Sequence, residues 1–328
     1  MAQRRPGLSE FELIGRFFTH PARGAKLGVG DDAALVRVRR GSELAISADM
    51  LIEGRHFFAG ADPALLGHKA LAVNLSDMAA MGATPRWTTL ALALPRVDLR
   101  WLGAFSRGFM VLARRYRVDL IGGDTTRGPL AIAVQIMGEV PAGTALRRDG
   151  AKVGDDIWVS GQLGEAAMAV AAIKGRIRVT ARERRALEQR LHAPVPRVAL
   201  GISLRGIAHS AIDISDGLLA DLAHICERSK VSAAIEWEAI PASPTARAYA
   251  QTDSGAQALL AGGDDYELCF TASPRRRSDI LRASKRAGAT VTLIGRITRP
   301  TRSAPPVQVL DSVGKPLRVR GRGYDHFG

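Results

Sequence analysis

The stretch that decides the fold is VDLIGGDTTRGPLAIAVQIMGEV, residues 118–140. Residues 118–121 are a short run of mostly apolar side chains that enters a Gly-Gly turn, and residues 130–140 are a longer apolar run. Both patterns predict strands. Residues 99–116, which precede them, carry apolar side chains at helical spacing. A helix followed by two strands in this order is typical of an α/β unit.

The same periodicity, followed outward from this unit, predicts helices and strands along the whole chain. Further helices are expected at residues 8–18, 63–81, 164–174, 181–191, 216–229 and 278–287. Further strands are expected at residues 34–38, 44–47, 90–94, 157–160, 211–214, 233–237, 268–271 and 292–294.

A polar, turn-rich segment at residues 146–155 separates two halves of the pattern. The chain has 328 residues, a length that favours two domains. We therefore predict an α+β fold, made of two-layer α/β domains, with residues 1–145 in the first domain and residues 146–328 in the second.

Composition narrows the class of protein. Hydrophobic residues make up 46% and charged residues 24% of the chain, which is ordinary for a globular protein. No apolar run is long enough for a membrane-spanning helix, and the N-terminal residues lead into an amphipathic stretch rather than a signal core. The sequence predicts a cytoplasmic protein with no membrane partner. Its two cysteines, Cys226 and Cys269, exclude a disulfide framework and a zinc cluster, and we expect both to be buried packing residues.

The net charge of +14 raises the question of nucleic-acid binding. The excess is scattered arginine, with short clusters at Arg182, Arg184 and Arg185 and in a predicted loop at residues 275–277. Neither cluster is interleaved with the aromatic side chains that a strand-binding surface uses for stacking. We interpret both clusters as solvated faces and predict no nucleic-acid partner.

The acidic residues are distributed differently, because they gather in short Gly-, Ser- and Thr-rich segments. The first segment, GVGDDA at residues 28–33, matches the weak dinucleotide pattern G-x-G-x-x-A. Two carboxylates at such a position repel a pyrophosphate unless a cation lies between them, so a metal-mediated phosphate site is the more consistent interpretation. The alternative is an acidic turn before a strand, and this segment alone leaves both open.

Other acids strengthen the metal interpretation. Asp49 belongs to the Ser47-Ala48-Asp49 segment at the end of a predicted strand. Asp77 lies three residues after Asn74 among apolar side chains of a predicted helix, where a carboxylate requires a partner. Asp124 follows two glycines that permit close backbone approach to a ligand. Asp213 and Asp216 lie at a predicted strand end and helix start, where helix capping explains Asp216 but not Asp213.

The tripeptide Gly-Asp-Asp occurs three times. The copy at residues 154–156 precedes a strand, and we assign Asp155 and Asp156 to turn chemistry. The copy within residues 262–267 also precedes a strand, and it is either another turn or a ligand-facing loop.

Oxygen donors without cysteine or metal-spaced histidine favour Mg²⁺ or Mn²⁺, and magnesium commonly serves phosphates. The chain has no G-x-x-x-x-G-K-[ST] loop and lacks the H-R-D and D-F-G elements of protein kinases. Carboxylates bridged to phosphates by several metal ions are an alternative way to hold the phosphates.

Seven motifs, in order along nearly the whole chain, resemble those of the thiamine-monophosphate kinase family. They are GVGDD (28–32), SAD (47–49) with His56, ALAVNLSDMAAMGA (70–83), GGDTT (122–126), IDISDG (212–217), GGDDYEL (262–268) and GYDHF (323–327). Single motifs also resemble relatives in the same superfamily, which are aminoimidazole ribonucleotide synthetase, selenide water dikinase and a hydrogenase maturation factor.

The resemblance implies phosphorylation of thiamine monophosphate to thiamine diphosphate, with ATP as co-substrate and several Mg²⁺ ions. It also implies a homodimer in which the N-terminal domains, each with a mixed sheet and helices, join their sheets, and sites that lie between domains. No protein base is implied, because the attacking phosphate oxygen is mostly deprotonated at neutral pH.

The resemblance assigns roles residue by residue. Metal-binding positions are Asp32, Ser47, Asp49, Asp77, Asp124, Asp213 and Asp216. Nucleotide-contacting positions are Gly123, Asp124, Arg148 and Ser215. Positions near the thiamine substrate are His56, Asp264 and Tyr324. Two departures from the family pattern are Ala48, which offers only a backbone carbonyl where threonine is usual, and Asp264, which is shorter than the usual glutamate.

Three alternatives from the sequence are weighed against this function. Another ATP-using enzyme of the same superfamily is the main one. A dinucleotide-dependent oxidoreductase depends on residues 28–33 alone, and a nucleic-acid-binding module depends on the net charge alone.

Overall fold

The computed structural model describes residues 9–300 and 305–317. The chain divides into two compact units. The first unit contains the chain up to Asn74 together with Pro85–Glu139, and the second contains Leu75–Thr84 together with the chain from Val140 onward.

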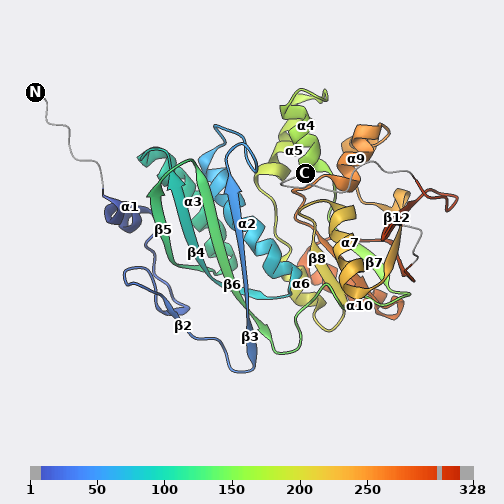
Figure 1. Ribbon diagram of the computed structural model, residues 1–328, viewed down its shortest axis with the longest axis horizontal. Helices are drawn as coiled ribbons and strands as arrows, with labels where there is room; N and C mark the ends of the chain where they lie inside the picture. Colours follow the sequence, from blue (N-terminus) through green and yellow to red (C-terminus); the bar gives the residue numbers. More distant parts are fainter. Residues whose placement is uncertain (1–8, 301–304, 318–328) are drawn as a thin grey trace, which may run out of the picture. The chain divides into compact units, whose positions relative to one another are not determined.

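The first unit is built on a four-stranded sheet with strand order β3-β6-β4-β5. The strands are β3 (Ser42–Ile52), β6 (Ala131–Pro141), β4 (Thr84–Leu94) and β5 (Asp119–Arg127). Two long helices, α2 (Pro63–Ala80) and α3 (Leu99–Tyr116), lie against one face of this sheet (Figure 1). The unit also contains α1 (Glu10–Phe17) and a two-stranded ribbon of β1 (Ala25–Leu27) and β2 (Leu35–Val36).

Local sequence explains where these helices begin and end. The Asp62 carboxylate accepts hydrogen bonds from the backbone N–H groups of Ala64 and Leu65 at the start of α2. Asp98 caps α3 in the same way, and α3 ends where Arg117 adopts a left-handed backbone. Ser9 and Glu12 form a reciprocal capping box on α1. The predicted limits of these helices are therefore confirmed to within about two residues.

The predicted Gly-Gly turn after residue 121 is wrong, because β5 continues through Gly122, Gly123 and Asp124 as a strand. Parallel pairing with β4, in which Leu90 lies opposite Gly123 and Ala91 opposite Asp124, supplies the hydrogen-bond ladder. A Cβ at Gly123 would lie 1.9 Å from the Leu90 carbonyl oxygen, so only glycine allows this approach. Gly122 and Gly123 therefore allow β5 to pair closely with β4.

The second face of this sheet is open and largely apolar. Along β3, Ile46 is 57% and Met50 is 55% exposed, whereas Leu51 is buried. Ala91 of β4 and Gln135 of β6 are exposed between buried neighbours. Antiparallel and mixed sheets commonly cover one face and leave the other to solvent or to a partner, but a solvated face is normally polar.

The second unit contains a six-stranded mixed sheet with strand order β12-β9-β11-β7-β10-β8. Its strands are β7 (Asp156–Ser160), β8 (Ser210–Asp213), β9 (Ser232–Glu236), β10 (Leu268–Ala272), β11 (Val291–Thr298) and β12 (Val307–Leu310). Its helices are α4 (Glu165–Ile173), α5 (Ala181–His192), α6 (Val198–Leu204), α7 (Leu218–Ser229), α8 (Pro244–Tyr249), α9 (Asp253–Ala261) and α10 (Arg277–Ala287).

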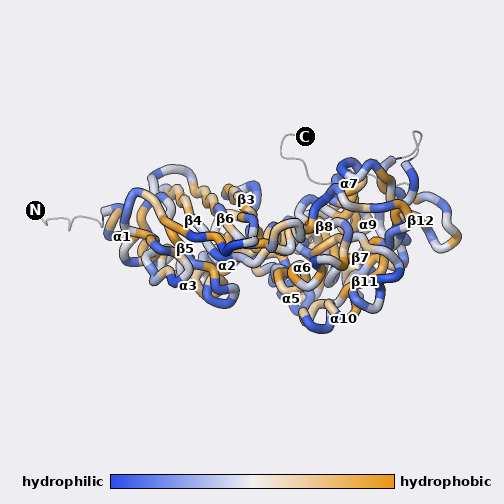
Figure 2. Tube along the Cα trace, turned by 90° about the horizontal axis from the view of Figure 1, so that it is seen from below, coloured by the Kyte–Doolittle hydropathy of each residue, from blue (hydrophilic) through white to orange (hydrophobic). Residues whose placement is uncertain are grey.

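A hydrophobic core joins this sheet to α7 and α9. Ile157, Ile212 and Ile235 from three strands pack with Leu222 of α7 and Leu259 of α9, and all five are buried. Hydrophobic residues follow the strands of both units in the same way (Figure 2). The predicted α+β fold with two domains, mixed sheets and helices is confirmed.

The structure corrects the turn assignment of Asp155 and Asp156 and the predicted loop at residues 275–277. Asp155 does take part in a turn, since it accepts a hydrogen bond from the backbone N–H of Lys152. Asp156, however, is the first residue of β7 and is 1% exposed, where it pairs with Arg277 through hydrogen bonds of 2.6 and 3.0 Å. The predicted loop at residues 275–277 is a 3-10 turn leading into α10, and Arg277 is held there by a buried carboxylate rather than by solvent alone.

Both cysteines are confirmed as buried packing residues. Burial raises the pKa of Cys226 to about 12 and also raises that of Cys269, so neither thiol supplies the reactive thiolate at neutral pH. We expect an aromatic disulfide reagent to modify neither thiol in the native protein and both thiols after denaturation, as measured by absorbance. Fast stoichiometric modification of the native protein would contradict the packing described here.

Within residues 9–300 and 305–317, no helix is both long and apolar enough to cross a lipid bilayer.

Candidate active site

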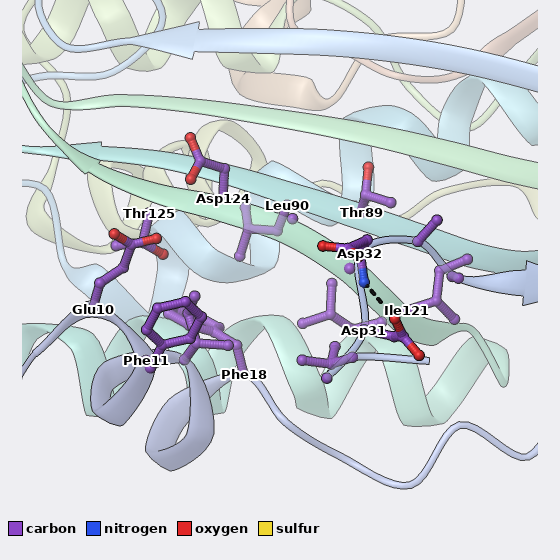
Figure 3. A pocket seen from close by; sticks show the side chains of 18 residues that line it. Glu10, Phe11, Phe18, Asp31, Asp32, Thr89, Leu90, Ile121, Asp124 and Thr125 are labelled. Carbon is purple, nitrogen blue, oxygen red and sulfur yellow. Dashed lines mark hydrogen bonds between the residues drawn. The ribbon is translucent and has the colours of Figure 1, made fainter. Parts of the chain in front are cut away.

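A cavity of about 600 Å³ in the first unit collects the acidic motifs of β5 and of the segment after β1. Asp31, Asp32 and Asp124 line it together with the Gly122-Gly123 backbone, and Glu10 of α1 contributes a fourth carboxylate (Figure 3). The described lining residues include no lysine or arginine. A cavity with this charge suits cations, or anions that arrive with cations.

The opposite wall of this cavity is aromatic and aliphatic. It includes Phe11 and Ile14 of α1 and Phe18, the residue after α1. Phe11 and Phe18 lie close to Glu10 in Figure 3. Phe11 is 82% exposed, although it is a large apolar side chain. Sequence reasoning placed a helix here but assigned it no role in a site; the exposed aromatic residue beside two acids was the available signal.

Ser47 and Asp49 lie on β3, and the structure does not bring them to Asp32 and Asp124. β3 and β5 form opposite edges of the four-stranded sheet. Three strand spacings of about 4.8 Å separate the two edges by about 14 Å, which is too far for one cation to bind aspartates from both.

His56 lies in a tight loop after β3. Its Nδ1 accepts a hydrogen bond of 3.0 Å from the backbone N–H of Ile52, so this atom carries no proton and a neutral ring is protonated at Nε2. The Nζ of Lys69, a residue only 2% exposed, lies 3.5 Å from the His56 carbonyl oxygen and donates to it. The loop therefore presents a half-buried imidazole with a defined tautomer.

In the second unit, the structure brings Asp77 to Asp213 and Arg148, which lie far apart in the sequence. Asp213 ends β8 and is only 4% exposed. Burial, reinforced by the negative charge of Asp77, raises the pKa of Asp213 to about 7, and the Arg148 guanidinium acts in the opposite direction. A buried carboxylate whose pKa is raised by a second carboxylate indicates a place where a cation would be bound.

The segment after Asp213 is fixed by an aspartate that sequence reasoning missed. The Asp221 carboxylate accepts hydrogen bonds of 3.1 Å from the backbone N–H groups of Ser215, Asp216 and Gly217. Asp221 is itself 3% exposed, and burial raises its pKa to about 8. The backbone N–H groups at the start of α7 are therefore already hydrogen-bonded within the protein.

The third Gly-Asp-Asp copy lies against this segment. The backbone N–H of Asp264 donates to the Ser215 carbonyl at 2.8 Å, and that of Tyr266 donates to the Ile214 carbonyl at 2.8 Å. At Gly263, a Cβ would lie 2.4 Å from the Ser215 carbonyl oxygen. Ser215, Asp216 and Asp264 therefore occupy adjoining loops of one unit.

A buried ion pair anchors the far end of this loop. Glu267 is 4% exposed. Its carboxylate accepts hydrogen bonds from Nε and Nη2 of Arg197, and one of 2.5 Å from the Ser160 hydroxyl. Gly161 has a positive φ of +60°, and a Cβ there would lie 2.0 Å from the Glu267 carboxylate. Neither Arg197 nor Glu267 was singled out from the sequence.

Two further observations bound the site. In the described part of the chain, no three His, Cys, Asp or Glu side chains stand together as a ready metal cluster. The acids instead occur in pairs, such as Asp77 with Asp213, that would need water or phosphate oxygens to complete the coordination of a cation. Tyr324 lies outside the described residues.

Comparisons with known proteins show the family of the chain. Residues 30–140 match the family model described as AIR synthase related protein, N-terminal domain, and residues 152–307 match the corresponding C-terminal domain. A curated thiamine-monophosphate kinase from Salmonella typhimurium is 44% identical over 325 residues, which cover 97% of this chain and 98% of that protein.

Solved structures give the same result. The crystal structure of thiamine-monophosphate kinase from Stenotrophomonas maltophilia is 46% identical, with a TM-score of 0.81 over 88% of this chain and 91% of that chain. AaThiL complexed with AMPPCP and TMP is 30% identical, with a TM-score of 0.75 over 90% of this chain and 92% of that chain. With identities of this size over nearly full length, the chain belongs to the thiamine-monophosphate kinase family.

Proposed function

We propose that this enzyme transfers the γ-phosphoryl group of ATP to thiamine monophosphate, forming thiamine diphosphate by direct in-line transfer with several Mg²⁺ ions. The observation that carries the proposal is the convergence of Asp77 with Asp213 and Arg148 from distant motifs. The curated relatives named thiamine-monophosphate kinase support the substrate, and a relative solved with AMPPCP and TMP supports the nucleotide.

The residues present fit Mg²⁺ as the metal. Their donors are carboxylate and hydroxyl oxygens, and the pair Asp77 and Asp213 has the electrostatics that a divalent cation relieves. We assign the metal ligands to Asp32, Ser47, Asp49, Asp77, Asp124, Asp213 and Asp216. When bound, Mg²⁺ neutralises phosphate charge and aligns the reacting oxygens.

The chain's own residues position the two substrates. Gly123 and Asp124 present backbone and carboxylate at the cavity of the first unit, and Arg148 and Ser215 complete the ATP contacts in this proposal. His56, Asp264 and Tyr324 are assigned to thiamine monophosphate. No protein base is required, because the second pKa of the acceptor phosphate is about 6, so its attacking oxygen is mostly deprotonated at neutral pH.

A homodimer joined through the N-terminal sheets follows from the same proposal, with residues 1–145 as the dimerising, ATP- and Mg²⁺-binding domain. Its support is the open apolar face marked by Ile46 and Met50, together with the separation of Asp49 and Asp124 on opposite sheet edges. In the proposed dimer, a second copy of the chain supplies at each sheet edge the metal ligands that one chain carries only at its opposite edge. We place the enzyme in the cytoplasm.

The decisive experiment incubates the protein with ATP, Mg²⁺ and thiamine monophosphate and separates the products chromatographically. Thiamine diphosphate should form in equal amount to ADP. Aminoimidazole-type and selenide acceptors, offered in parallel, should give no acceptor-dependent ADP. Phosphorylation of one of those acceptors instead would identify another enzyme of the superfamily.

Metal dependence gives a further prediction, because the enzyme's carboxylates need cations beyond the one that ATP carries. At saturating ATP, the rate should keep rising as free Mg²⁺ increases after all ATP has become MgATP, and EDTA should abolish turnover. Initial rates against free Mg²⁺ measure this. A rate that is already maximal at equimolar Mg²⁺ and ATP would contradict additional protein-bound metals.

A further inference from the structure

The loop of residues 262–267 has an unusual backbone for a loop without glycine at its centre. Asp264 has φ +70° and Tyr266 has φ +50°, both in the left-handed region that L side chains rarely adopt. Three backbone hydrogen bonds hold this loop to the neighbouring segment: Asp264 to Ser215, Tyr266 to Ile214, and Ile214 to Glu267. Such strain persists only where the surrounding structure fixes it, and it commonly marks functional sites.

The acids of this loop have different environments. Asp265 turns inward, because both of its carboxylate oxygens accept from the backbone N–H of Gly164 at 2.9 and 3.1 Å. Glu267 is buried and paired with Arg197. Asp264 is only half-buried, and its Oδ1 accepts a hydrogen bond of 2.9 Å from the hydroxyl of Tyr266. Asp265 is half-buried as well, so Asp264 differs from the other two acids in that its carboxylate is bonded neither to the Gly164 backbone nor to Arg197.

We propose that Tyr266 is a positioning residue for recognition of the cationic substrate: its hydroxyl fixes the Asp264 carboxylate. Tyr266 is 9% exposed, so its surroundings restrict the ring, and its O–H is directed at Asp264 Oδ1. The hydrogen bond restricts the carboxylate before substrate arrives, which lowers the entropy lost on binding. This inference depends on the proposed function, in which Asp264 faces the positively charged thiamine ring.

The test removes one oxygen atom. Tyr266→Phe keeps the buried ring and deletes the hydroxyl. Tyr249→Phe is a matched control, because it deletes the exposed hydroxyl at the end of α8 that donates to Ser254 of α9. We expect Tyr266→Phe to raise the KM for thiamine monophosphate by about tenfold, as for loss of one hydrogen bond to a charged group. The kcat and the KM for ATP should stay within about twofold, and Tyr249→Phe should change none of the three.

A double-mutant cycle separates positioning from a structural effect. If Tyr266 acts through Asp264, then Asp264→Asn should already show the full rise in KM, and adding Tyr266→Phe should raise it no further. Additive effects, equal rises in both KM values, or an unchanged KM in Tyr266→Phe would each overturn the proposal. Calorimetry then measures the affinity of the wild type, both single variants and the double variant for thiamine monophosphate, so that the same cycle is tested without turnover. An inactive wild-type enzyme that still binds thiamine monophosphate with this pattern would refute the proposed function while leaving the role of Tyr266 intact.

Discussion

Asp77→Asn is expected to reduce turnover by at least about 100-fold while making the metal-free protein more resistant to heat. The substitution removes a proposed metal ligand that lies next to Asp213, whose pKa is raised by burial and by the charge of Asp77. Without Mg²⁺, the two carboxylates repel each other, so an amide at residue 77 relieves the repulsion. With Mg²⁺, the same change removes one ligand and leaves the reacting phosphates less well held.

Two measurements check this prediction, namely steady-state kinetics in Mg²⁺ and thermal unfolding in EDTA. Asp62→Asn is the matched control, since it makes the same chemical change at the start of the same helix, where asparagine caps as well as aspartate. Near-normal activity of Asp77→Asn would refute the metal assignment. A large drop in melting temperature in EDTA would instead show that Asp77 holds the fold together through other contacts.

Arg197→Leu is expected to destabilise the enzyme by about 3–5 kcal/mol, because it leaves the Glu267 carboxylate buried without its cation. In the folded protein the two side chains are only 15% and 5% exposed. The double variant with Glu267→Gln should recover much of the loss, since an uncharged amide is cheaper to bury than an unpaired carboxylate.

Urea unfolding followed by circular dichroism measures both variants. Arg184→Leu is the control, because Arg184 and Glu188 form an exposed i,i+4 pair whose loss should cost less than about 1 kcal/mol. If Arg197→Leu were as mild as Arg184→Leu, water or another cation would have to replace Arg197 beside Glu267. If the double variant were no better than the single one, packing of the Arg197 side chain would outweigh the charge.

Local patterns were sufficient for the long helices and for the chemical character of the motifs. Helix α3 follows from the apolar spacing between Asp98 and Arg117, and these two residues, which adjoin the helix, cap its ends. The oxygen-rich segments around Asp32, Asp124 and Asp213 predicted a cation-dependent phosphate chemistry before any contact was known, because donor type depends on residue identity alone.

The limits of the strands and the positions of several short helices were harder to predict from the sequence than the long helices. The predicted strands at residues 44–47 and 90–94 are parts of β3 and β4, which each span eleven residues. Sheet pairing extends strands through residues such as Glu43 and Arg86, whose own propensities give no such signal. No helix was predicted at α6, α8 or α9, which are short and depend on packing in the second unit.

The three Gly-Asp-Asp copies show most clearly what each level of structure decides. The sequence by itself determined that all three are acidic, turn-prone and adjacent to strands. The tertiary structure decided that Asp32 lines a cavity, that the buried Asp156 pairs with the half-exposed Arg277, and that Asp264 lies beside Ser215. The physical reason is that the role of a carboxylate is set by the charge and solvent around it, and these come from residues distant in the sequence, which only folding brings near.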